Sequence, residues 1–189
     1  DNTQMASLAK SVRDFALRSD GHSALQTLLL SMQTTHPSAL PTVINTGTNT
    51  SGKTALHLAA WKGSVHSVTT LLHYGADINV YSVGTGNYGK TALFYAITQC
   101  RDDVVVELLK HGASVKIVNN KGQTPRSLGP SHLLEETIQL IESAESADSS
   151  KWLNFYTSHY SEANTCFGDL DPRFHELGIT TSSTQYQYY

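Results

Sequence analysis

The sequence has few cysteines and no long apolar run. Cys100 and Cys166 are the only cysteines among 189 residues, which excludes a disulfide framework and a four-thiolate metal site and fits a reducing compartment. No stretch approaches the roughly eighteen apolar residues of a membrane-spanning helix. The chain starts without an initiator methionine and without the basic and apolar pattern of a signal peptide. We therefore expect a soluble piece of a longer intracellular protein, cytoplasmic or nuclear, without membrane contact.

A strong excess of one charge is also missing. Thirteen Lys and Arg stand against sixteen Asp and Glu, a formal net charge of -3, which offers little to the counterion release that drives general nucleic-acid coating. The sequence has no glycine-rich phosphate loop and no H-E-x-x-H, C-x-x-C or G-x-S-x-G motif. His66 and His73 are seven residues apart, but no carboxylate or cysteine accompanies them on one helix face. We therefore expect no enzyme activity, no cofactor and no metal site.

Residues 144–189 differ in composition from the rest of the chain. They hold six acidic and two basic residues, against ten and eleven in residues 1–143, and nine of the sixteen aromatic residues. The polar run at 144–150 is typical of a linker, whereas a plain linker would be poor in aromatics. We expect one domain over residues 1–143, followed by a linker and an aromatic-rich tail over residues 144–189.

Three interpretations of this tail stay open. Trp152, Phe155 and Tyr156 have helical spacing and would pack on the end of the preceding domain. Tyr160 and Tyr186 lie in polar surroundings that suit a linear motif recognised by another protein. The tail also fits the start of a further domain.

A short motif recurs inside the first domain. The residues GKTAL at 52–56 appear again at 89–93 and, more loosely, at 122–125. In the first two copies a Leu-Leu pair and a Gly-Ala pair follow at equal distances from the motif, so four additional residues lie between Gly75 and Thr91. Such self-similarity is the signature of a repeat architecture.

Each copy predicts two short helices. Thr54, Thr91 and Thr124 stand where an N-cap hydroxyl would accept from the first amides of a helix. Apolar residues at helical spacing then predict a second helix, which Gly75 and Gly112 end in a left-handed conformation. Because two short helices cannot bury their apolar faces alone, neighbouring copies must stack.

Residues 54–59, Thr-Ala-Leu-His-Leu-Ala, match the T-P-L-H-x-A signature, and on this basis the chain resembles the ankyrin-repeat family. The resemblance implies an all-α solenoid of about four helix-turn-helix units joined by short β-hairpins or loops, in which His57 bonds within its own turn. The sequence departs from the family pattern at Phe94, Cys100 and Lys116, where His, Gly and Asn are usual. These departures concern local loop geometry rather than the fold.

Four units follow from this register. Residues 1–51 form a divergent N-terminal capping repeat, with helices expected at 3–18 and 24–32 and a long connector at 36–51. A repeat with an inserted loop covers 52–88, a second repeat covers 89–121, and a C-terminal capping repeat covers 122–143.

The resemblance also implies where a partner would bind. In the family, recognition positions lie at hairpin tips, on the exposed face of each first helix and before the terminating glycine. Carried over, these positions are Thr50, Ser51, Lys53, Trp61, Lys62, Tyr74 and Tyr81 in one repeat, and Asn87, Tyr88, Lys90, Thr98, Gln99, His111 and Val118 in the next.

Two features of this set have competing interpretations. Trp61 is either a rigid aromatic that dominates an interface or a side chain that packs sideways onto the first unit. The inserted loop at 81–89 either projects two tyrosines toward a partner or has no partner.

Two functions remain in competition. The first is a protein–protein interaction module, a scaffold or targeting domain that grips another protein or peptide segment. The alternative is a regulatory segment of a nucleic-acid-processing enzyme, in which Lys53, Lys62 and Lys90 contact phosphates while Trp61 and Tyr88 stack on bases. Eleven bases against ten acids within the repeats favour the protein ligand.

Overall fold

Short helices joined by loops make up the described part of the chain, which covers residues 2–48, 50–84 and 89–145 of a computed structural model. The elements are α1 (Asn2–Leu17), α2 (His22–Thr35), α3 (Leu40–Asn45), α4 (Ala55–Lys62), α5 (Val65–His73), α6 (Ala92–Thr98), α7 (Asp102–Lys110), α8 (Pro125–Leu128), the 3-10 turn η1 (Gly129–Ser131) and α9 (Glu135–Glu145). No strand occurs within these ranges, so of the two connector types predicted the structure has loops. The tail and the three interpretations of it lie outside the described residues.

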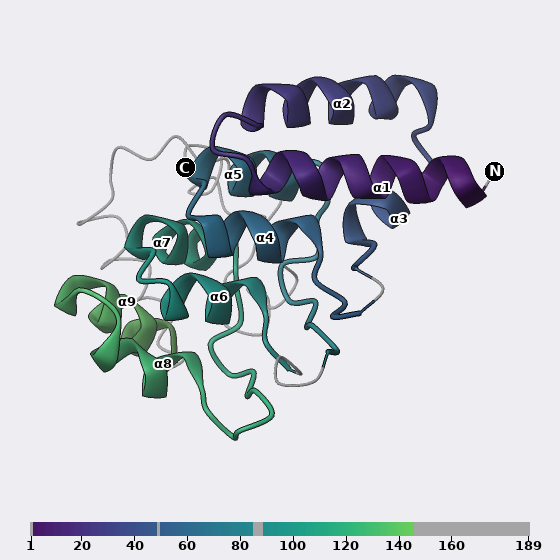
Figure 1. Cartoon of the computed structure of the whole chain (residues 1–189). Coiled ribbons are helices and arrows are strands. Elements are labelled where there is room, and N and C mark those ends of the chain that lie inside the picture. The colour runs from purple at the N-terminus through teal and green to yellow at the C-terminus, as the bar shows by residue number, and fades with distance from the viewer. Residues whose placement is uncertain (1, 49, 85–88, 146–189) are drawn as a thin grey trace, which may run out of the picture.

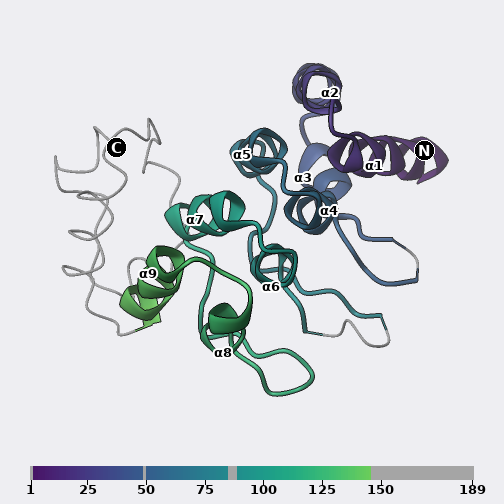
Figure 2. The same cartoon turned by 60° about the vertical axis from the view of Figure 1, so that its left-hand side comes forward.

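The helices form two rows. In the inner row α1 packs on α4, α4 on α6 and α6 on α8, and in the outer row α2 packs on α5, α5 on α7 and α7 on α9 (Figures 1 and 2). The loops that lead into α4, α6 and α8 project from the same edge of the molecule (Figure 2). The predicted all-α solenoid of stacked helix pairs is therefore confirmed.

The core of the stack follows from the apolar periodicity of the two repeats. Leu56 and Ala59 of α4 are buried, as are Val68 and Leu71 of α5, and the equivalent residues of α6 and α7 are buried in the same way. Each fully buried Leu or Val contributes about 1.5–3 kcal/mol relative to an exposed one. A single helix pair does not cover the apolar faces of its two helices, so this stabilisation depends on packing against the neighbouring units.

The connector predicted at 36–51 contains a helix that the sequence analysis missed. α3 begins with Pro41 in its first turn, buries Leu40, Val43 and Ile44, and packs on α1. Two prolines in a short segment favour a loop, but proline is tolerated in the first turn of a helix because that amide has no partner there. The long connector predicted at 36–51 therefore includes a short helix at residues 40–45.

Left-handed residues end the helices as predicted, including at one position without glycine. Gly75 and Gly112, after the outer helices, have φ values of 90° and 80°. Gly63, after α4, has a φ of 87°, and its equivalent after α6 is Cys100 with a φ of 53°. The backbone at Cys100 thus keeps the turn of the family although its side chain is not suited to it.

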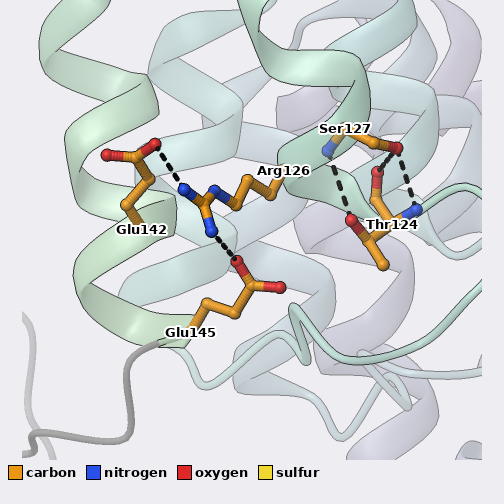
Figure 3. A network of polar contacts seen from close by, with 5 residues as sticks. All are labelled: Thr124, Arg126, Ser127, Glu142 and Glu145. Carbon is orange, nitrogen blue, oxygen red and sulfur yellow. Dashed lines mark hydrogen bonds and ion pairs between the residues drawn. The ribbon is translucent and has the colours of Figure 1, made fainter.

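Polar contacts stabilise the C-terminal unit in addition to apolar ones. The Thr124 hydroxyl accepts from the Ser127 amide, and the Ser127 hydroxyl accepts in turn from the Thr124 amide, so the predicted cap at Thr124 is confirmed (Figure 3). Arg126 of α8 reaches Glu142 at 3.3 Å and Glu145 at 3.5 Å on α9. α9 thus continues through residues 144 and 145, so the first two residues of the segment predicted as linker are helical.

Candidate partner-binding surface

Three loops, here called fingers, project beside the inner row of helices. Finger 1 covers residues 48–53, finger 2 residues 82–90 and finger 3 residues 119–123. Each is closed by a backbone hydrogen bond from its first residue: Thr48 donates to Lys53, Ser82 to Lys90 and Asn119 to Gln123, all at 3.0 Å. The four residues inserted between the first and second copies therefore lengthen finger 2 without changing how it closes.

Hydrogen bonds between units join finger 1 to the described start of finger 2 and link the loops below the fingers. The Ser51 carbonyl of finger 1 accepts from the amides of Val83 and Gly84 in finger 2, at 3.0 and 3.2 Å. Below the fingers, Asn45 Oδ1 accepts from the Asp77 amide at 2.8 Å, and Asn79 Oδ1 accepts from the Ser114 amide at 2.9 Å. At the third equivalent position stands Lys116, which has no amide oxygen to continue this series.

His57 joins the start of α4 to the next unit. Its Nδ1 lies 3.0 Å from the Thr54 amide and 2.9 Å from the Thr54 hydroxyl, so Nδ1 is the acceptor and the proton sits on Nε2. Nε2 then donates to the Lys90 carbonyl at 3.1 Å. The ring is fully buried, and this burial lowers its pKa to about 4 despite weaker opposing contributions from backbone hydrogen bonds. The predicted bonding of His57 within its turn is confirmed, and the bond to the next repeat is an addition.

The prediction that the Thr91 hydroxyl accepts from the first amides of its helix is wrong. Thr91 starts α6 as expected, but its hydroxyl oxygen is buried and has no hydrogen-bond partner among the described residues. In α4 the matching hydroxyl bonds to the His57 ring, whereas in α6 the equivalent residue is Phe94, which has no polar atom. The departure from the family pattern at Phe94 therefore leaves one hydroxyl unpaired.

Tyr95 of α6 lies between two finger lysines and the core. Its ring centroid is 5.1 Å from Nζ of Lys53 and 6.0 Å from Nζ of Lys90, within the range of cation–π attraction. Its hydroxyl donates to Oγ of Ser82 at 3.2 Å, and burial raises its pKa. Burial also lowers the pKa of Lys90, and the charges of Lys121 and Lys53 lower it further. A single tyrosine thus holds lysines from successive fingers near one another.

Three predicted recognition residues are large, apolar and exposed. Trp61 at the end of α4 is 44% exposed, Tyr81 before finger 2 is 50% exposed, and Val118 at the equivalent position before finger 3 is 52% exposed. The partial exposure of Trp61 leaves its ring accessible to a partner, and both interpretations of this residue stay predictions. Finger 2 is described only at its two ends, so Asn87 and Tyr88 lie outside the described residues.

The remaining predicted residues fall into two groups. Lys62, Thr98 and Gln99 lie at the C-terminal ends of inner helices and are half-buried, and the Thr98 hydroxyl donates to the Phe94 carbonyl at 3.0 Å. Tyr74 and His111 instead follow the outer helices α5 and α7. Tyr74 packs against the core, and His111 lies 3.6 Å from Glu107 on its own helix. The structure therefore brings Lys53 and Lys90 together but places Tyr74 and His111 in the other row.

The histidines show one contact that spacing does not predict. His66 on α5 lies against His22 on α2, with ring centroids 5.2 Å apart, whereas His73 contacts its neighbour Tyr74. No group of three His, Cys, Asp or Glu among the described residues is arranged to hold a metal ion. Within the same residues, every helix is too short or too polar to span a bilayer.

The repeat register agrees with a known family. The model of the ankyrin repeat family matches residues 51–82 and 88–120. The chain contains ankyrin repeats. Ankyrin repeats generally mediate protein–protein interactions and are typically not catalytic. The first and last units lie outside the matched residues, as their divergent sequences lead one to expect, and no curated protein matches the chain.

Two residues of this surface escaped the sequence analysis. The sequence places Tyr95 in an apolar helix, where it is expected to be a core residue. Its contacts with lysines of two fingers depend on the side-chain conformations of those lysines. Lys121 occupies finger 3 as Lys53 and Lys90 occupy fingers 1 and 2, but in its copy the order of Lys and Gly is reversed. Alignment on Thr124 puts Gln123 rather than Lys121 at the position of Lys53 and Lys90, so the repeat register gives no signal for it.

Proposed function

We propose that this ankyrin-repeat domain is a scaffold or targeting module that binds another protein through its inner helices and fingers. The observation that carries the proposal is the exposed ring of Trp61 at the end of α4. An exposed tryptophan on a rigid helix loses little entropy on binding, and its truncation often costs an interface about 2 kcal/mol or more.

The fingers extend the proposed surface along the stack. Tyr81 and Val118 are exposed at equivalent positions of two units, and the amides of Val83 and Gly84 donate to the Ser51 carbonyl, which joins the described part of finger 2 to finger 1 before a partner arrives. A preformed surface does not have to be ordered on binding, which favours affinity. Lys62, Thr98 and Gln99 would border this surface, whereas Tyr74 and His111 would belong to its margin.

Capture of cellular proteins on the immobilised 189-residue chain, compared with a Trp61→Ala variant, tests this function. We expect at least one protein to be retained by the wild type and reduced about tenfold or more by Trp61→Ala, since 1.4 kcal/mol corresponds to a factor of ten. The melting temperature should stay nearly unchanged because the ring is exposed.

Leu30→Ala on the outer helix α2 is the matched control, since Leu30 is another exposed apolar side chain on the opposite row. It should leave capture unaffected. A set of captured proteins that is the same for all three chains would refute the proposed surface. A large fall in melting temperature for Trp61→Ala would assign the ring to the core instead.

A further inference from the structure

The charges of the repeats are divided between the two rows, although their sum is nearly balanced. Between residues 21 and 134 the only acidic residues are Asp77, Asp102, Asp103 and Glu107. The three fingers and the helices α4, α6 and α8 contain no acidic residue at all, and each finger contains one lysine: Lys53, Lys90 and Lys121. The side of the stack that carries the fingers is therefore positive.

Three of the four acidic residues make contacts within the repeats, and three of the four, Asp102, Asp103 and Glu107, lie on the outer helix α7. Asp77 Oδ1 accepts from the Asn79 amide, and Asp102 Oδ1 accepts from the Leu134 amide, both at 2.9 Å. Glu107 on α7 is 3.0 Å from Nζ of Lys110 and 3.6 Å from Nδ1 of His111. Lys53 and Lys121 make no ion pair with a carboxylate of the described residues.

Each of the three fingers contributes one lysine. Lys53 and Lys90 both lie within 6.0 Å of the Tyr95 ring centroid, and Lys121 is close enough to Lys90 to act on its charge. Packed helices lie roughly 8–10 Å apart, so successive units, each with one finger lysine, follow at about that interval, with Lys121 two residues before the repeat position of Lys53 and Lys90. Three residues of an extended peptide span about the same distance, at roughly 3.3 Å per residue.

We infer that the lysine row recognises an extended acidic segment of a partner protein, with carboxylates at every third position. The carboxylates would face Lys53, Lys90 and Lys121 in turn, and the residues between them would meet the exposed side chains of Tyr81 and Val118. This inference rests on the proposed function, because it names the chemistry of the partner for the same surface.

A peptide fits this row better than a nucleic acid does. Single-stranded nucleic acids are bound along a continuous positive groove. Here each finger has one lysine, Tyr81, Val83 and Val118 in or beside the fingers are exposed and apolar, and the formal charge of the whole chain is -3. Separate positive charges of this kind suit a ligand whose negative charges are also separated by uncharged residues.

Fluorescence anisotropy with two labelled peptides tests the spacing. The full chain should bind Glu-Ser-Val-Glu-Ser-Val-Glu at low salt, and binding should weaken as salt is added because exposed pairs are screened. The isomer Glu-Glu-Glu-Ser-Val-Ser-Val has the same charge and composition and should bind more weakly by a factor of about 1.4 to 5 for each ion pair that it fails to form, since exposed ion pairs are each worth roughly 0.2–1 kcal/mol. Equal binding of the two peptides, or no binding of either, would overturn the inference.

Two double variants with the same net charge separate the row from general electrostatics. Lys53→Gln with Lys121→Gln should weaken the spaced peptide by about two- to twenty-five-fold, whereas Lys10→Gln with Lys116→Gln, two exposed lysines outside the fingers, should change it less than twofold. Lys53→Glu with Lys121→Glu should instead favour the swapped peptide Lys-Ser-Val-Glu-Ser-Val-Lys. Equal losses in both double variants would mean that no specific row exists.

Further outcomes distinguish this inference from the function on which it rests. If capture of a partner depends on Trp61 while the spaced peptide does not bind, the inference alone fails. If the peptide binds as described but no captured protein depends on Trp61, the proposed interaction module fails and the charge recognition stands. Tighter binding of a single-stranded oligouridylate than of the spaced peptide would overturn the inference in favour of nucleic acid.

Discussion

His57 is the residue whose chemistry most directly affects the stability of the stack. In the folded chain its pKa is lowered from 6.5 to about 4, so the unfolded chain binds the proton more readily than the folded one. Its contribution is complete above pH 6.5 and is lost as the pH falls from 6.5 toward 4. Over this range the free energy of unfolding falls by roughly 3 kcal/mol, and its slope is at most about 1.4 kcal/mol per pH unit.

We therefore expect the free energy of unfolding to fall on acidification between pH 6.5 and about 4, and His57→Asn to reduce that slope. Asparagine can still accept from the Thr54 amide but does not take up a proton in this range. Urea denaturation across the pH range measures the effect. His66→Asn, at an exposed histidine, should keep the wild-type slope, and an unchanged slope in His57→Asn would contradict the prediction.

Cys100 holds a left-handed conformation that glycine adopts without strain. Cys100→Gly should therefore stabilise the domain by about 1 kcal/mol, visible as a higher urea midpoint. The converse change, Gly63→Ala, should destabilise it, because φ is 87° there and the added Cβ would lie 2.7 Å from Cδ of Arg101. A lower midpoint for Cys100→Gly would show that its side chain stabilises the turn more than the backbone strains it.

At the scale of whole elements, side-chain amides of asparagine link successive units. Asn79→Ala removes the acceptor of the Ser114 amide and should cost about 1–2 kcal/mol of unfolding free energy. Lys116→Ala changes the equivalent, exposed position one unit later and should stay within about 0.5 kcal/mol of the wild type. Chemical denaturation of both variants compares them, and similar losses would mean that the amide bond is not what matters at Asn79.

The helices that the sequence predicts best are those with a strong apolar period. The helices α5 and α7 carry Val and Leu at helical spacing, and the expected Val68 and Leu71 of α5 and Leu108 and Leu109 of α7 are buried, although Ser67 and Glu107 are buried as well. The missed helix α3 is six residues long with Pro41 in its first turn, too short for a period to be seen. Its formation depends on burial of Val43 and Ile44 against α1, which is a tertiary effect.

At the scale of the whole molecule, each unit contacts only its neighbours, so damage to one end should remain local. Ile141 of α9 is fully buried, and Ile141→Ala should cost about 2–5 kcal/mol within the last unit. Hydrogen exchange should show lost protection in α8 and α9 while α4 and α5 keep theirs. Leu134→Ala, at a side chain 65% exposed, is the control, and a uniform loss along the chain would indicate a single cooperative unit.

The candidate surface was only partly predictable, because repeat register and side-chain packing contribute different information. Register alone placed Trp61 and Tyr81 at exposed positions, where the structure has them. It did not separate Tyr74 and His111, which follow outer helices, from the residues of the inner row. The contacts of Lys53 and Lys90 with the Tyr95 ring depend on side-chain rotamers, which a repeat period does not predict.

The series of asparagine bonds between units stops at Lys116, which affects how the stack resists a mechanical load. The first three units are joined in series by Asn45 and Asn79, whereas the junction to the last unit lacks such an asparagine and has the Asp102 bond to the Leu134 amide. A load applied along the stack should therefore peel off α8 and α9 first, and the finger lysines of the two central repeats would stay in place while the end gives way.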